Sequence, residues 1–147
     1  ARSALEDDFD MSGASEPQPK KRVMKKAVGS YVDGVLELRH ILQKGLGIVR
    51  DEKTMRGALT ELTELQEKIA DCYDPTASVY ENESLQNCCL LGQALLLSAD
   101  NRKESRGAHT RSDFPEEHSE YQKQTVANYF DGKIQITLES MGEENED

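Results

Sequence analysis

One segment of the chain, from Leu85 to Ala99, would be apolar nearly all round if it formed a helix. A helix with apolar side chains all round its circumference must be covered on every side, because apolar surface left in water is unfavourable. Two partner helices would cover most of it, and the remaining face would need a further surface. The segment therefore predicts the inner helix of a bundle, over residues 80–101. Ser78 with Glu81 fits a capping box at its start, with Asn82 as a rival cap.

Two amphipathic helices are predicted before this segment. Apolar residues recur at three- and four-residue steps over 23–46 and again over 52–72, with most charged residues on the other sides. Gly45 ends the first pattern, as helix-terminating glycines do, and Asp51 is a candidate N-cap for the second. Gly34 lies inside the first pattern, where glycine costs about 1 kcal/mol relative to alanine. We therefore expect a break or a close contact there.

Two β-prone runs, 125–130 and 133–140, follow near the C-terminus and are joined by Asp131-Gly132. Asp-Gly supplies the positive φ of a type I′ turn, which predicts a β-hairpin. Pairing across this turn puts Tyr129 and Ala127 on the same face as Ile134 and Ile136. A lone hairpin is marginal in water, so we expect it to dock on another surface.

The predicted fold is mainly α: a three-helix antiparallel bundle, then an extended charged loop, then a small C-terminal β-hairpin. Residues 1–22, with an acidic cluster followed by Ser, Gly, Pro and basic residues, predict a disordered tail or linker. The folded domain is predicted over 23–141. Residues 142–147 predict an acidic, frayed tail.

The 147 residues carry a formal net charge of −10, which makes nucleic acid and bare anionic membrane poor partners. No apolar run is long enough to span a bilayer, and no signal-peptide pattern opens the sequence. The cysteines (Cys72, Cys88 and Cys89) lack metal-ligand spacing and are predicted to be buried free thiols. His118, among glutamates, is interpreted as part of a solvated acidic loop rather than a metal ligand.

A cluster of charges follows the third helix within the run 102–115, RKESRGAHTRSDFP. Arginines could clamp a substrate carboxylate, because a guanidinium meets a carboxylate through two hydrogen bonds. They could equally fix a loop by pairing with Glu104, Asp113 or a neighbouring domain. Gly107 permits a backbone conformation that other residues resist. The residues singled out are Arg102, Lys103, Glu104, Arg106, His109, Arg111 and Asp113.

This run resembles the late signature of the flavoprotein subunits of succinate dehydrogenases and fumarate reductases, and of their relative L-aspartate oxidase. The run 47–51, GIVRD, resembles the start of the second bundle helix in that family, and 123–129 resembles its next strand. The similarity covers residues 38–139. The charged run is specific, whereas the helices alone would match many bundles.

The resemblance implies that the chain is the C-terminal helical domain of an FAD-dependent flavoprotein that interconverts fumarate and succinate. In the family this domain packs on the flavin-binding domain and lies near the iron–sulfur subunit. The FAD-binding and substrate residues belong to earlier domains, so no catalytic, cofactor-binding or metal-ligating residue is predicted here. The seven charged residues are candidates for a domain or subunit interface. We expect this chain to be inactive alone, and the parent to be cytoplasmic or held at the cytoplasmic membrane face by other subunits.

Two alternatives stay open. The parent could be an L-aspartate oxidase. The chain could also be a stand-alone helical interaction module whose basic loop binds an acidic partner. The fragment hypothesis leaves apolar surface exposed on the third helix and the hairpin, and therefore predicts self-association of the isolated chain. The module hypothesis predicts a well-folded monomer.

Overall fold

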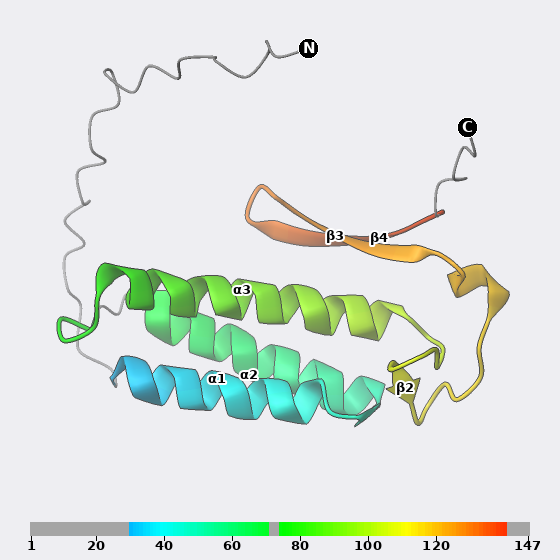
Figure 1. Cartoon of the computed structure of the whole chain (residues 1–147), viewed down its shortest axis with the longest axis horizontal. Coiled ribbons are helices and arrows are strands. Elements are labelled where there is room, and N and C mark those ends of the chain that lie inside the picture. The colour runs from blue at the N-terminus through cyan, green and yellow to red at the C-terminus, as the bar shows by residue number, and fades with distance from the viewer. Residues whose placement is uncertain (1–29, 71–73, 141–147) are drawn as a thin grey trace, which may run out of the picture.

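Three helices lie side by side, and a two-stranded hairpin lies along one of them (Figure 1). The structure is a computed structural model that describes residues 30–70 and 74–140. The predicted tails, the first residues of the first predicted helix and Cys72 lie outside the described residues. In the described part, the predicted order of helices, charged loop and hairpin is confirmed.

The first helix, α1, spans Tyr31–Gly45. Ser30 precedes it with extended backbone (φ −80°, ψ 159°), and its hydroxyl accepts a hydrogen bond from the Asp33 amide at 3.3 Å. The Asp33 carboxylate accepts the Ser30 amide at 3.2 Å, which completes a capping box. The prediction of one helix over 23–46 was therefore wrong at its start, because residue 30 is not helical. Apolar periodicity continued through this point and hid the cap.

The second helix begins where the sequence predicted, and the third begins one residue before the predicted start. In α2, Glu52–Ala70, the Asp51 carboxylate accepts the Thr54 amide at 2.8 Å. In α3, Val79–Asn101, Ser78 and Glu81 form the predicted capping box. Asn82 does not cap the helix; its amide group instead bonds the backbone of Asp74.

The core lies where the three helices meet. Gly34 makes the close contact that was one of the two predicted options, since a Cβ there would lie 2.6 Å from Leu85 Cδ2. Gly92 allows a similar approach, because a Cβ would lie 2.9 Å from Leu42 Cδ2. The buried apolar side chains are Leu38, Ile41, Met55, Ala58, Leu62, Leu65, Leu85, Cys89, Leu96 and Ala99.

Gly45 should tolerate no side chain, whereas Gly57 should. A Cβ on Gly45 would lie 2.5 Å from Ala58 Cβ and 2.7 Å from Leu96 Cδ2, while Gly57 has nothing within 4 Å of that position. We expect Gly45→Ala to cost about 1–3 kcal/mol through overpacking. We expect Gly57→Ala, inside α2, to stabilise by about 0.5–1 kcal/mol. Urea denaturation of the two variants checks this pair; equal effects of the same sign would contradict the packing described.

The hairpin covers one face of α3. Strands β3 (Gln124–Phe130) and β4 (Lys133–Glu139) pair Tyr129 with Ile134 and Ala127 with Ile136, as predicted. Asp131 and Gly132 both have positive φ, 50° and 75°, as a type I′ turn requires. The surface on which the hairpin docks is α3 (Figure 1), and α2 side chains line the cleft between the hairpin and α3.

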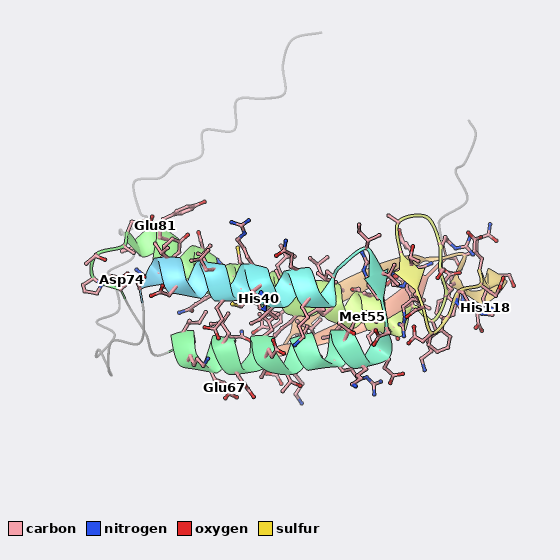
Figure 2. All side chains as sticks on the ribbon, turned by 90° about the horizontal axis from the view of Figure 1, so that it is seen from below. His40, Met55, Glu67, Asp74, Glu81 and His118 are labelled. Atoms are coloured by element: carbon pink, nitrogen blue, oxygen red, sulfur yellow. The ribbon has the colours of Figure 1, made fainter. Side chains whose placement is uncertain are left out.

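The loop after α1 meets the charged loop through a pairing that the sequence did not reveal. Strands β1 (Val49–Arg50) and β2 (Thr110–Arg111) form a short parallel pair. Strands of two residues carry no periodic signal, and their partners are distant in sequence. Figure 2 places Asp74 and Glu81 at one end of the bundle and His118 at the other, so the charged loop lies at the end opposite the start of α3.

Candidate functional site

Arg111 is buried at the C-terminal end of α3, with 1% of its surface exposed. Its Nη1 donates to the carbonyls of Ala99, Asp100 and Arg102 at 3.2–3.3 Å. The last carbonyls of a helix lack partners within the helix and carry partial negative charge, which a cation offsets. The last turn of α3 contains no basic residue of its own. Arg111 therefore acts as a C-terminal cap supplied from the loop.

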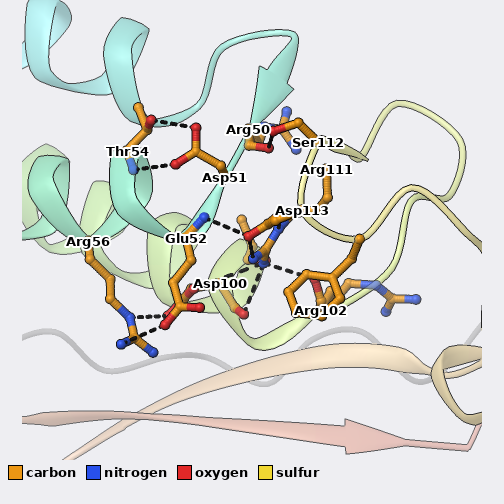
Figure 3. Close-up of polar contacts among 12 residues, drawn as sticks. Arg50, Asp51, Glu52, Thr54, Arg56, Asp100, Arg102, Arg111, Ser112 and Asp113 are labelled. Atoms are coloured by element: carbon orange, nitrogen blue, oxygen red, sulfur yellow. Dashed lines mark hydrogen bonds and ion pairs between the residues drawn. The ribbon is translucent and has the colours of Figure 1, made fainter.

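Asp113 connects this cap to the start of α2 (Figure 3). Its two carboxylate oxygens accept from Arg111 Nε and Nη2 at 2.7 and 2.6 Å. The same carboxylate accepts the Glu52 amide, the first of α2, at 2.9 Å. The hydrogen bonds from Arg111 hold the pKa of Asp113 well below its usual range. Charges of opposite sign therefore alternate from one helix to the other: the negative end of α3, the Arg111 guanidinium, the Asp113 carboxylate and the positive end of α2.

Glu104 is a fully buried carboxylate at the centre of the loop. It accepts from Arg102 Nη2 at 2.6 Å, from Arg106 Nε and Nη2 at 3.0 Å each, and from the His118 amide at 3.0 Å. Burial alone would raise the pKa of Glu104, but the hydrogen bonds from Arg106, His118 and Arg102 outweigh it and lower the pKa to about 2. The carboxylate is therefore ionised and compensated.

Arg102 joins the loop to the hairpin. Its Nη1 donates to the Lys123 carbonyl at 2.9 Å and to Thr125 Oγ1 at 3.0 Å, and its Nη2 also donates to the Tyr121 carbonyl. These acceptors lie in and after a short 3-10 turn, Ser119–Tyr121, that leads into β3. A single guanidinium therefore fixes the end of α3, Glu104 and the start of the hairpin relative to one another.

His109 is held in one neutral tautomer between two arginines. Its Nδ1 lies 2.9 Å from Arg50 Nη1, and its Nε2 lies 3.2 Å from the Arg102 carbonyl. A guanidinium only donates and a carbonyl only accepts, so Nδ1 must accept and Nε2 must carry the proton. Burial lowers the pKa of His109, and the charges of Arg50, Arg111 and Arg102 lower it further, against the opposing effect of the Arg102 carbonyl.

Acidification should therefore weaken the domain through His109. Because its folded pKa lies below the unfolded value of about 6.5, the unfolded chain binds more protons as the pH falls through that value. Stability from this group is present above about pH 6.5 and declines below it. We expect His109→Gln, which keeps an acceptor for Arg50, to reduce the loss of stability between pH 7.5 and pH 5.5 in urea denaturation. An identical slope in the variant and the parent chain would contradict this assignment.

The backbone of the loop is shaped by two small residues. Gly107 has φ 58°, the positive value that the sequence anticipated, within a turn in which Arg106 and His109 exchange both backbone hydrogen bonds. Ser105 Oγ donates to the Phe114 carbonyl and accepts the Arg111 amide, each at 2.8 Å. Ser105 was not among the residues that the sequence singled out, because a serine in a charged loop gives no signal of these two hydrogen bonds.

The structure brings six of the seven predicted residues into one hydrogen-bonded network. The pairing of arginines with Glu104 and Asp113, which the structural interpretation predicted, is confirmed. Lys103 instead points its ammonium group toward the ring of Phe114, 6.0 Å from its centroid. Within residues 30–70 and 74–140, every buried side-chain nitrogen or oxygen has a partner. No group of acidic, histidine or cysteine side chains in those ranges could hold a metal.

Comparison with known proteins identifies the class to which this fold and loop belong. The domain resembles part of Escherichia coli quinol fumarate reductase with a TM-score of 0.64 and 26% identity, over 78% of this chain and 21% of that one. It also superposes on adenylylsulfate reductase of Archaeoglobus fulgidus, with a TM-score of 0.67 at 19% identity, which shows the fold alone. The family described as the fumarate reductase flavoprotein C-terminal domain matches residues 35–145. The chain belongs to this family.

Relatives come from several branches. A fumarate reductase flavoprotein subunit of Haemophilus influenzae is 34% identical over 100 residues, and a succinate dehydrogenase flavoprotein subunit of Coxiella burnetii is 33% identical over 106. An L-aspartate oxidase of Pyrococcus horikoshii is 32% identical over 102 residues. These matches cover 63–69% of this chain but only 17–18% of each relative. In the described residues, no helix is long and apolar enough to cross a membrane.

Proposed function

We propose that the chain is the scaffold domain of an FAD-dependent oxidoreductase of the fumarate reductase or succinate dehydrogenase type. In such a parent, the domain packs on the flavin-binding domain and offers part of the interface with the iron–sulfur subunit. The observation that carries this proposal is the family match, together with a charged loop whose arginines donate hydrogen bonds to other groups of the same chain. An L-aspartate oxidase parent is the alternative, because relatives of that name match at similar identity, 32% and 34%.

The internal pairing of the loop supports the structural role over the substrate clamp. A substrate clamp needs a guanidinium with free donors facing a cavity, whereas Arg111 is buried and donates to Asp113 and to three carbonyls. Arg102 and Arg106 are engaged by Glu104 in the same way. We therefore assign the loop to holding α2, α3 and the hairpin in one arrangement, with its outer surface, including Lys103, available to a neighbouring domain or subunit.

The parent chemistry is oxidoreduction with FAD, and this chain's contribution is structural. Lys103 is an exposed loop cation that can face a partner, whereas Arg106, whose side chain is 34% exposed, already pairs with Glu104 and Glu117. The stand-alone interaction module would need more such cations, because an acidic partner is recognised by charge that is not already neutralised. The parent location, cytoplasmic or at the cytoplasmic membrane face, follows from the same proposal.

Association in trans tests the proposal. The full chain is co-produced with the Haemophilus influenzae flavoprotein truncated before its own C-terminal segment, and the complex is isolated through a tag on the truncated partner. We expect the chain to copurify and the truncated flavoprotein to retain more FAD in its presence. Absence of both effects, with both polypeptides soluble and folded, would overturn the proposed function.

A further inference from the structure

The exposed side of α3 carries no charge over four turns. From Ser84 to Ala99 there is no Asp, Glu, Lys or Arg, although 31% of the chain is charged. A helix on the surface of a soluble domain ordinarily has charged residues on its outer face. The composition of α3 is therefore that of a helix surrounded by protein on every side.

Three neighbours cover only part of α3. On one side Gly92 meets Leu42 of α1, and on the next Gln93 donates to Gln66 of α2 at 2.7 Å. On a third side Leu90 and Leu97 face the hairpin across an open cleft of about 390 Å³, which Tyr129 and Ile134 line as well. The hairpin was thus the further surface that the sequence required, but it does not enclose the helix.

An uncharged stripe remains in solvent. From Ser84 to Ser98 the residues of this stripe follow one another at alternating steps of four and three positions, which places them on one side of the helix. Leu91 is 60% exposed and Leu95 48% exposed, and Cys88 is exposed although the sequence predicted a buried thiol. Single exposed leucines are ordinary, but two on successive turns without a flanking charge on that side form a patch. The stripe consists of the exposed residues Cys88, Leu91 and Leu95, with the half-buried Ser84 and Ser98 at its two ends.

We propose that this stripe is the surface on which the remaining part of the parent flavoprotein packs, through an uncharged and mainly apolar face of its flavin-binding part. The inference rests on the proposed function and gives it a location. The chain corresponds to only 17–18% of its relatives, so most of such a protein is available to cover the stripe. In the isolated chain, self-association would cover the stripe with a second copy. That copy fits less well than the rest of the parent, because two chains of net charge −10 repel each other around the contact.

Cys88 reports directly on whether the stripe is covered. Its thiol is exposed in the middle of the stripe, whereas Cys89 beside it is buried, and burial raises the pKa of Cys89 to about 11. Cys89 is therefore an internal control that should react slowly in every state, since only an accessible thiolate is a good nucleophile. Cys72→Ser removes the third thiol. Maleimide labelling resolved by tandem mass spectrometry then compares the full chain alone with its complex with the truncated Haemophilus influenzae flavoprotein.

We expect Cys88 labelling to slow by about tenfold or more in the complex, because access controls thiol reactivity. Leu91→Glu should abolish copurification while leaving the helical circular dichroism unchanged. Val32→Glu is the matched control, because Val32 is also an exposed apolar side chain, 60% exposed, but lies in the first turn of α1 and should not affect binding.

The outcomes separate the two proposals. A wild-type chain that copurifies while Cys88 stays reactive, or a Leu91→Glu chain that still binds, overturns the docking surface and leaves the proposed function standing. A wild-type chain that fails to copurify overturns the proposed function and this inference with it.

Discussion

Replacing Arg111 with methionine is expected to destabilise the domain by about 3–5 kcal/mol, the usual cost of breaking a buried ion pair by removing one partner. Methionine fills similar space but donates nothing. Asp113 would lose both side-chain donors, and the carbonyls of Ala99, Asp100 and Arg102 would lose theirs. Because Asp113 also accepts the first amide of α2, the loss should spread to the α2 N-terminus.

Two companion variants make this result specific. Arg111→Lys keeps the charge but not the planar fork that reaches Asp113 and the helix carbonyls together, so we expect an intermediate loss. Arg56→Met removes another arginine that pairs with Asp100, but one whose side chain is 62% exposed, and should leave the unfolding midpoint near the wild-type value. Urea denaturation followed by circular dichroism measures all three. If Arg111→Met and Arg56→Met had similar effects, Arg111 would not be the cap described here.

Replacing Glu104 with glutamine should be about as damaging, by about 3–5 kcal/mol near neutral pH. The variant leaves the guanidinium groups of Arg102 and Arg106 without their carboxylate and turns an amide N–H toward donors. The lowering of the Glu104 pKa from 4.5 to about 2 corresponds to about 3 kcal/mol, which agrees with that range.

The stabilisation contributed by the Glu104 carboxylate should depend on pH in a defined way. Since the folded pKa of Glu104 is below the unfolded one, its stabilisation is fully present above about pH 4.5 and is lost as the pH falls toward 2. The stabilisation from Asp113 is also lost at acidic pH, but it is lost in wild type and in Glu104→Gln alike. The difference in unfolding free energy between the two proteins therefore isolates the contribution of Glu104. We expect this difference in unfolding free energy to shrink between pH 6 and pH 3. A difference that stayed constant would show that Glu104 is not stabilised as an anion.

The sequence predicted those parts of the fold that have local signals. The starts of α2 and α3 follow from caps at Asp51 and Ser78, and the hairpin register follows from Asp131-Gly132. The start of α1 was missed because apolar spacing continues across Ser30, so the capping box carried the only information about the boundary.

The candidate site was predictable in its members but not in its geometry. Charge and spacing singled out the loop, and the pairing of arginines with Glu104 and Asp113 was one of two interpretations. That Arg111 is buried under the end of α3 depends on contacts with backbone carbonyls 9 to 12 residues earlier in the sequence, which no side-chain pattern encodes. The β1–β2 pair and the bond between Arg50 and His109 are long-range in the same sense.

The measurement that tests the account most directly is an absorbance spectrum of the purified 16.5 kDa chain after incubation with excess FAD and removal of the unbound cofactor. We assign flavin binding to other parts of the parent and therefore expect no flavin band near roughly 450 nm, because a cofactor's chemistry needs a site that binds and orients it. A band at one flavin per chain would contradict it. In that case the charged loop and its neighbours would form a cofactor site rather than a scaffold.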